Sequence, residues 1–153
     1  MQKTNEHVLL VEDNDIDALL FQQALRVARP AATLYRVQDV LSAVYYLRGI
    51  GFFTDRAAHP IPYLVVIDLH LASVDGMELL KWIQQDPGMK QRLITLIYTN
   101  STEPAHSETA FALGATSFLQ KPDNRDALVT SLKLLHENLQ AANLLPPDEA
   151  QEG

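Results

Sequence analysis

The chain contains no cysteine. This absence excludes a disulfide scaffold, an iron–sulfur cluster, a zinc site built from thiolates and a catalytic cysteine nucleophile. With no cysteine and no clustered pair of histidines, the sequence also suits soft metal ions poorly. Any metal chemistry is therefore expected to use oxygen ligands.

Long apolar runs and an excess of positive charge are absent as well. No stretch approaches about 18 consecutive apolar residues, so no transmembrane helix is predicted. The polar residues 1–7 lead into an apolar run that is too short and too early for a signal peptide. Acidic residues outnumber basic ones by 19 to 12, and the formal charge is −7, whereas domains that bind phosphate backbones are usually basic. We therefore expect a cytoplasmic protein that binds neither membranes nor nucleic acids.

The chain does contain enough apolar residues for one hydrophobic core. Its 153 residues are the length of one domain, and 47% of them are hydrophobic. Short apolar runs alternate with amphipathic segments. The runs predict five strands, at residues 8–11, 34–37, 63–67, 93–98 and 116–120. The amphipathic segments predict five helices, at about 16–27, 39–47, 77–83, 103–113 and 123–142, with a long loop at 50–62.

This alternation favours an α/β fold. A five-stranded parallel sheet with helices on both faces, a doubly wound sandwich, is the expected architecture. We expect the domain to span residues 1–142, and a Pro-rich, acidic tail outside the core to span residues 143–153. In the first helix, the residues at helical spacing are Ile16, Leu19, Leu20, Gln23, Ala24 and Val27.

Polar side chains directly follow four of the predicted strands, where ligands bind in an open α/β sheet. Taken singly, Asp13 could be a helix N-cap, Thr99 a turn residue and Lys121 a solvated surface charge. Together they predict a site, because the carboxyl ends of parallel strands meet at one edge of the sheet. The candidate residues are Glu12 and Asp13 after the first strand, Asp68 after the third, Thr99 after the fourth and Lys121 after the fifth.

The residue types at this edge point to phosphoryl chemistry. Crowded carboxylates repel one another and partly hold protons unless a cation is present, and carboxylate, water and phosphate oxygens suit Mg²⁺. A carboxylate can accept a phosphoryl group as an acyl phosphate, while a lysine and a hydroxyl stabilise the phosphoryl oxygens. The sequence therefore predicts Mg²⁺-dependent phosphoryl transfer to an aspartate.

Five short segments carry a family pattern: residues 11–14 (Val-Glu-Asp-Asn), 66–68 (Val-Ile-Asp), 75–76 (Asp-Gly), 98–99 (Tyr-Thr) and 120–122 (Gln-Lys-Pro). In order and spacing they closely resemble the receiver domain of bacterial two-component response regulators, over about residues 7–140. The resemblance implies a flavodoxin-like sheet with strand order 2-1-3-4-5. It also implies a signalling protein that is not a conventional enzyme, although it catalyses its own phosphorylation and dephosphorylation.

The resemblance assigns the metal site and the acceptor. It implies that Asp68 is the phosphoacceptor. Asp13 and Asp68 would bind Mg²⁺ together with the backbone carbonyl of His70, and Glu12 would help through a water molecule.

The resemblance also assigns the phosphoryl contacts and a switch. Thr99 and Lys121 would contact the phosphoryl group. Phe118, three residues before Lys121, matches an aromatic switch that turns inward when Thr99 moves; without the resemblance it would be interpreted as a core or edge aromatic. Departures from the family pattern alter the surroundings of the site but remove no reacting group. They are His70, Ala72, Asn100 and Asp123.

A narrower resemblance rests on the 50–62 loop and residues 144–147 (Leu-Leu-Pro-Pro). These features look like the small single-domain response regulators paired with bacterial phytochrome histidine kinases. The implied partners are a sensor histidine kinase of the phytochrome type and, downstream, a phosphotransfer protein. Output would then occur through protein–protein contacts.

Apolar side chains near the C-terminus predict a homodimer. The single-domain regulators of the narrower resemblance have no output domain that these side chains could contact. Leu134 lies roughly opposite the stripe of the last helix that should face the sheet, in line with Ala127 and Ala141. Leu144 and Leu145 then follow, and we expect them to pair across a two-fold axis. The stripe that should face the sheet is Leu128, Leu132, Leu135 and Leu139.

Other interpretations fit less well. A flavodoxin would need a phosphate-binding loop where residues 12–15 are Glu-Asp-Asn-Asp, and a haloacid-dehalogenase-type phosphatase would need an aspartate in place of His70. Residues 49–51 (Gly-Ile-Gly) lack the strand and the third glycine of a dinucleotide motif. The alternative that stays open is a receiver fold that binds partners without being phosphorylated. Such modules typically lose the acceptor or the lysine, and both Asp68 and Lys121 are present.

Overall fold

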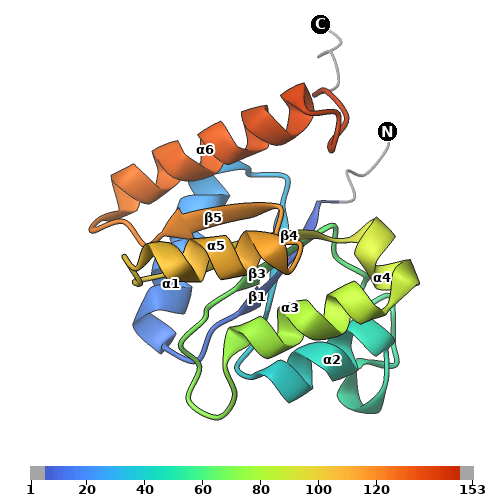
Figure 1. The fold of residues 1–153 in the computed structure, drawn as a ribbon. Helices are drawn as coiled ribbons and strands as arrows, with labels where there is room; N and C mark the ends of the chain where they lie inside the picture. Colours follow the sequence, from blue (N-terminus) through green and yellow to red (C-terminus); the bar gives the residue numbers. More distant parts are fainter. Residues whose placement is uncertain (1–5, 149–153) are drawn as a thin grey trace, which may run out of the picture.

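The computed structural model describes residues 6–148 of the chain. Its centre is a sheet of five parallel strands in the order β2-β1-β3-β4-β5 (Figure 1). This confirms the predicted architecture and strand order, and each strand begins and ends within one residue of its predicted bounds. The strands are β1 (His7–Val11), β2 (Thr33–Val37), β3 (Leu64–Ile67), β4 (Ile94–Thr99) and β5 (Ser117–Gln120).

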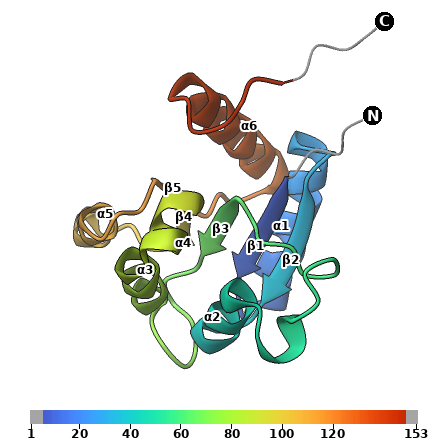
Figure 2. The same cartoon turned by 90° about the vertical axis from the view of Figure 1, so that its right-hand side faces the viewer.

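Helices cover both faces of the sheet (Figures 1 and 2). One face packs against α1 and α6, and the other packs against α2, α3 and α5. Strands β1, β3 and β4 lie in the middle and are buried on both faces, which is why their sequences are continuous apolar runs. The helices are α1 (Asp15–Ala28), α2 (Val40–Arg48), α3 (Gly76–Gln85), α4 (Pro87–Arg92), α5 (Pro104–Ala112) and α6 (Arg125–Ala141), with a 3₁₀ turn, η1 (Gly51–Phe53).

The predicted count of five α-helices is wrong, because the described residues contain six. Helix α3 ends where expected, but Asp86 then caps a further short helix, α4. Its side chain accepts hydrogen bonds from the backbone N–H groups of Gly88 and Met89, at 3.0 and 3.2 Å. Pro87 occupies the first turn of α4, a position that proline tolerates because no backbone hydrogen bond is needed there. The Asp-Pro-Gly segment therefore both ends one helix and begins another. The predicted 50–62 loop likewise contains η1.

The buried face of α1 agrees only in part with the predicted one. Ala24 is fully buried and Leu20 packs against the core, but Ile16, Leu19 and Val27 are 78%, 53% and 52% exposed. The stripe that packs on the sheet is rotated around the helix relative to the predicted one, and because both have the same helical repeat, the periodicity alone could not distinguish them. The buried residues of α1 are Ala18, Phe21, Ala24 and Leu25.

The last helix has the predicted buried face, but the segment after it does not lie wholly outside the core. Leu134 is 54% exposed, as expected from its position opposite the buried stripe. After α6, Asn143 adopts a left-handed conformation with φ of 61°. The chain then turns back, so that Leu145 packs against the α1–α6 side of the core while Leu144 stays 50% exposed. The predicted tail beyond residue 148 lies outside the described residues.

Among residues 6–148, no helix is both long enough and apolar enough to span a membrane.

Candidate functional site

Four of the five parallel strands deliver the predicted side chains to one edge of the sheet. Glu12 follows β1, Asp68 follows β3, Thr99 ends β4 and Lys121 follows β5. The backbone N–H of Asp68 donates to Val11 O at 3.1 Å, and that of Lys121 donates to Thr99 O at 2.8 Å. These bonds continue the sheet hydrogen-bonding just beyond the strands, so the side chains start from a rigid frame.

Three carboxylates converge at this edge and form what we call the carboxylate trio: Glu12, Asp13 and Asp68. One oxygen from each lies within 4.8 Å of the others. Glu12 and Asp68 are buried, at 0% and 5% exposure. Clustered carboxylate oxygens fit a hard divalent cation such as Mg²⁺ or Mn²⁺, which would neutralise their mutual repulsion.

Asp13 is not the helix N-cap, the alternative role suggested by its sequence position. The cap of α1 is Asn14, whose side chain accepts a hydrogen bond from the Asp17 N–H at 2.9 Å. Asp13 is thereby left free to face the opposite loop, where its Oδ2 accepts a hydrogen bond from Ala72 N–H at 2.8 Å. This contact joins the loop after β1 to the loop after the acceptor strand.

Lys121 is not a solvated surface charge either. Its side chain is only 7% exposed, and Nζ donates to Glu12 Oε1 at 2.7 Å, to Asp17 Oδ2 at 2.6 Å and to Asp68 Oδ2 at 3.2 Å. Burial alone would lower the pKa of Lys121, but hydrogen bonds to Asp17 and Glu12 and the charge of Asp68 hold this pKa above its usual range. The ammonium therefore stays charged and in contact with Asp68.

Sequence analysis missed Asp17, which belongs to the first turn of α1. The only available signal was an acidic residue one helical turn after Asp13, and such residues are common near helix N-termini because they interact favourably with the helix dipole. Its contact with Lys121 joins residues 104 positions apart in the chain. The contact becomes visible only in the folded chain, where α1 begins at the same edge of the sheet at which β5 ends.

Glu12 is the carboxylate whose ionisation the fold opposes. Burial, a hydrogen bond with Asp68 and the charge of Asp68 raise the pKa of Glu12 to about 7, although Lys121 acts in the opposite direction. Near neutral pH this side chain therefore exchanges a proton readily, or loses it outright when a cation binds nearby.

The backbone around Asp68 is shaped by its own loop and by Gly76. Asp68 Oδ1 accepts a hydrogen bond from His70 N–H at 3.1 Å. A Cβ atom at Gly76 would lie 2.2 Å from Asp68 O and 2.9 Å from the Ile67 side chain. Glycine is therefore required where α3 begins, because its backbone approaches the acceptor loop more closely than any side chain allows.

Thr99 and Phe118 occupy the positions that sequence analysis gave them. Thr99 is fully buried at the end of β4, where its hydroxyl oxygen accepts a hydrogen bond from Ser101 N–H at 3.2 Å. Phe118 lies on edge strand β5, half-buried, and packs against the α2–α3–α5 side of the core. Its ring thus reaches the core without being enclosed by it, as a movable side chain would.

The residues that depart from the family pattern lie around the rim. Ala72, Asn100 and Asp123 are exposed. His70 is exposed too, and its ring lies edge-on to the ring of His106 with 5.7 Å between centroids. A histidine on the acceptor loop therefore contacts the first turns of α5.

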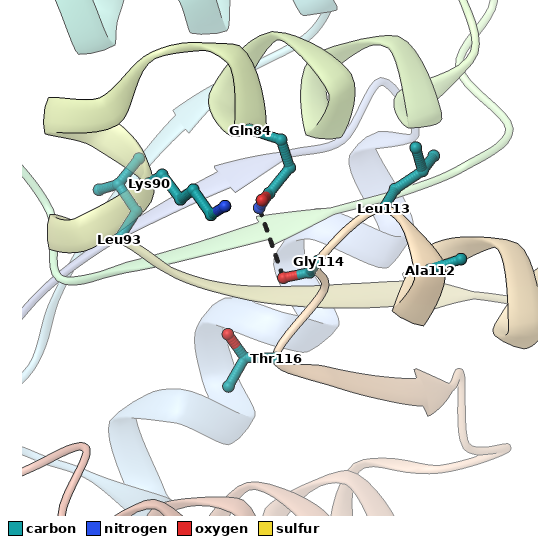
Figure 3. A pocket seen from close by; sticks show the side chains of 7 residues that line it. All are labelled: Gln84, Lys90, Leu93, Ala112, Leu113, Gly114 and Thr116. Atoms are coloured by element: carbon teal, nitrogen blue, oxygen red, sulfur yellow. Dashed lines mark hydrogen bonds between the residues drawn. The ribbon is translucent and has the colours of Figure 1, made fainter.

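A hollow of about 450 Å³ lies at the opposite edge of the sheet (Figure 3). Leu93 and Thr116, which precede β4 and β5, contribute to its wall, and Gln84 Nε2 donates to Gly114 O across it at 3.5 Å. No carboxylate lines it, and it shares no residue with the carboxylate trio. The remaining lining residues are Lys90, Ala112 and Leu113.

The fold is a five-stranded parallel sheet with acidic, hydroxyl and ammonium groups gathered at one edge, and comparison with known families shows which family has this arrangement. Residues 8–133 match the response regulator receiver domain family. The match covers most of the chain, so the chain belongs to this family and is a signalling domain of two-component systems.

Individual relatives extend the match. The response regulator Rcp1 of Synechocystis sp. is 31% identical over 117 residues, which are 76% of this chain and 77% of Rcp1. Among solved structures, the phosphorylated cyanobacterial phytochrome response regulator RcpA has a TM-score of 0.80 at 27% identity, covering 94% of this chain and 100% of RcpA. The Mn²⁺-bound form of Rcp1 has a TM-score of 0.74 at 25% identity, covering 95% and 99% of the two chains.

Proposed function

We propose that the protein accepts a phosphoryl group on Asp68 from a sensor histidine kinase, in a reaction that requires Mg²⁺, and signals through protein–protein contacts. The observation that carries this proposal is the surroundings of Asp68. A buried carboxylate lies 3.2 Å from a buried ammonium and within 4.8 Å of two further carboxylates. An interaction module that is never phosphorylated has no use for this costly grouping of buried charges.

In the proposed step, an Asp68 carboxylate oxygen attacks the phosphorus of a phosphohistidine. The P–O bond to Asp68 forms as the P–N bond breaks, and the leaving imidazole keeps the electron pair and takes a proton from solvent. Lys121 and the hydroxyl of Thr99 stabilise the phosphoryl oxygens. Held by Asp13, Asp68, the His70 carbonyl and, through water, Glu12, Mg²⁺ would neutralise the charge that develops. Attack of water on phosphorus later restores the carboxylate and releases inorganic phosphate.

The relatives support a more specific partner. Rcp1 is a response regulator, and RcpA is a phytochrome response regulator, so we infer a phytochrome-type histidine kinase as the donor. The −7 formal charge supports output by contact with a protein, such as a downstream phosphotransfer protein, rather than by contact with nucleic acid. The reaction with such partners would take place in the cytoplasm.

A homodimer is the proposed assembly. Leu134 and Leu144 are each at least half exposed on and just after α6, and Ala127 and Ala141 add exposed apolar surface to the same helix. Two copies of this surface can pair across a two-fold axis. Leu145 was expected to take part, but it contributes mainly to the core of its own chain.

The test is intact-protein mass spectrometry after incubation with acetyl phosphate and Mg²⁺. The wild-type protein should gain one phosphoryl adduct, and D68N, which keeps the shape but loses the nucleophile, should gain none. D123N, which changes an exposed aspartate two residues after Lys121, should be labelled like the wild type. Equal labelling of D68N would overturn the assignment of the acceptor, and an unlabelled wild type would favour the unphosphorylated interaction module.

A further inference from the structure

We infer that Asp17 is a positioning residue that holds the Lys121 ammonium in place while the rest of the site changes during phosphorylation. The inference rests on the proposed function, since it describes how that same site works. Its basis is the contact between Lys121 Nζ and Asp17 Oδ2, which at 2.6 Å is the shortest of the three bonds that Nζ donates.

Asp17 differs in kind from the two other partners of Lys121. Glu12 and Asp68 both belong to the carboxylate trio, whereas Asp17 does not. A divalent cation would draw the oxygens of Glu12 and Asp68 toward itself, and phosphorylation would convert the Asp68 carboxylate into an acyl phosphate. Neither cation binding nor phosphorylation needs to alter the bond between Lys121 and Asp17.

Asp17 is also well placed to serve as an anchor. The backbone N–H of Asp17 donates a hydrogen bond to the side chain of Asn14, the N-cap of α1, at 2.9 Å. This bond holds Asp17 in the first turn of the helix. The Lys121 ammonium lies over the ring of Tyr98, with Nζ 5.3 Å from the ring centroid. Tyr98 is itself fully buried and packs edge-on against Phe21 of α1 at 5.2 Å. The ammonium is therefore held between rigid elements, and its other two hydrogen bonds go to Glu12 and Asp68.

A lysine side chain has four rotatable bonds, so an ammonium without an anchor samples many positions. Charge stabilisation of a transferring phosphoryl group depends on a donor that is already in place. Loss of Asp17 should therefore slow phosphoryl transfer to Asp68 while leaving the cation site intact.

The experiment compares D17N with D15N in the full chain. Asp15 is a matched control, because it lies in the same first turn of α1 but pairs with Arg36 at 2.9 Å and is 84% exposed. With saturating acetyl phosphate and Mg²⁺, the initial rate of Asp68 labelling should fall about tenfold in D17N and change by less than about twofold in D15N. The Mg²⁺ dissociation constant, measured by calorimetry, should be unchanged in both.

A double-mutant cycle shows whether Asp17 acts through Lys121. In a K121A background, D17N should cause no further fall in rate, because the group it positions is already gone. A tenfold fall that persists in K121A, a D17N rate equal to that of D15N, or a faster D17N rate would each overturn the inference.

A second readout does not depend on phosphorylation. Reductive methylation followed by peptide mass spectrometry reports how freely Lys121 Nζ reacts, and D17N should increase its labelling several-fold over both wild type and D15N. Unchanged labelling would contradict the anchoring role even if the rate fell. A wild type that shows protected Lys121 but no phosphoryl adduct would overturn the proposed function and leave the anchoring contact standing.

Discussion

At the scale of single residues, the most consequential feature is a carboxylate that is buried without enough positive charge. Lys121 is shared by Glu12, Asp17 and Asp68, so one cation faces three acids, with Asp13 close by. The pKa of Glu12 rises to about 7, mainly because of burial and then because of Asp68. A group whose folded-state pKa lies above its unfolded value destabilises the fold once the unfolded chain ionises. The buried carboxylates therefore lower the stability of the protein when no cation is bound.

This imbalance predicts that the free energy of unfolding depends on pH through the ionisation of Glu12. Below about pH 4.5, Glu12 is protonated in both states and contributes no penalty; the penalty grows as pH rises toward 7 and then levels off on the order of 3 kcal/mol. In EDTA, urea denaturation should show the wild type losing stability relative to E12Q between pH 5 and pH 8.

Mg²⁺ supplies the complementary test. At pH 8, tenfold excess of Mg²⁺ over its dissociation constant should stabilise the wild type by about 1.4 kcal/mol. E78Q is the matched control, since Glu78 is exposed and pairs only with Lys81 at 2.9 Å, and it should follow the wild type throughout. Parallel pH curves for wild type and E12Q, or a wild type indifferent to Mg²⁺, would contradict this account.

At the scale of elements, α1 presents two unlike faces. Its buried stripe packs under α6, while Ile16 and Leu19 lie exposed within the turns that also carry Asp17. Under the proposed function, a phosphohistidine approaches Asp68 within bonding distance, so the donor protein would cover this part of the surface. Exposed apolar side chains beside a charged site provide the desolvated contact that protein recognition requires.

We therefore predict that I16S and L19S weaken transfer from a histidine kinase without slowing the reaction with acetyl phosphate. The apparent KM for the phosphorylated kinase that labels the wild type should rise about tenfold, which corresponds to about 1.4 kcal/mol. V27S is the matched control, because Val27 is as exposed as Leu19 but lies about two turns from Leu19 and three from Ile16, at the far end of α1. A rise of the same size in V27S, or slower labelling by acetyl phosphate, would exclude α1 as the docking element.

At the scale of the whole molecule, the residues after α6 contact the C-terminal end of α1. Asp148 pairs with Arg29 at 3.2 Å, and Gln140 Nε2 donates to Asp148 at 3.2 Å and to Pro146 O at 3.1 Å. The charge of Arg29, acting against the effect of burial, lowers the pKa of Asp148. Leu145 packs against the core, so the residues that follow α6 are part of the fold. Leu144 is exposed.

The predicted homodimer can therefore be tested without damaging the fold. The double variant L134D/L144D should reduce the mass measured by light scattering after size exclusion from twice the chain mass to the chain mass. Its Asp68 labelling should be unchanged. L41D is the matched control, since Leu41 is 61% exposed on α2, across the sheet from α6. A wild type that stays monomeric at tens of micromolar, with or without acetyl phosphate, would remove the case for self-association.

From the sequence alone it was possible to predict the strands, the sheet edge that holds the site and five of its side chains. Short apolar runs bounded by turn residues indicate strands, and residues directly after parallel strands share one edge. Glu12, Asp13, Asp68, Thr99 and Lys121 could therefore be grouped at this edge before any contact was known. The strand order came from the family resemblance, because periodicity does not state which strands are neighbours.

Which side chains touch could be seen only in the folded molecule. Asp17 contacts Lys121 because α1 begins at the edge of the sheet where β5 ends, and Gly76 is required because α3 starts against Asp68 O. Two stripes of α1 have the same helical period, so only the packing of the helix shows that Ile16 is exposed. The turn at Asn143 redirects the chain, and Leu145 is partly buried as a result. Local sequence determines the period and the ends of an element. Its rotation and its distant contacts depend on the packing of the whole core, which is decided by residues far away in the chain.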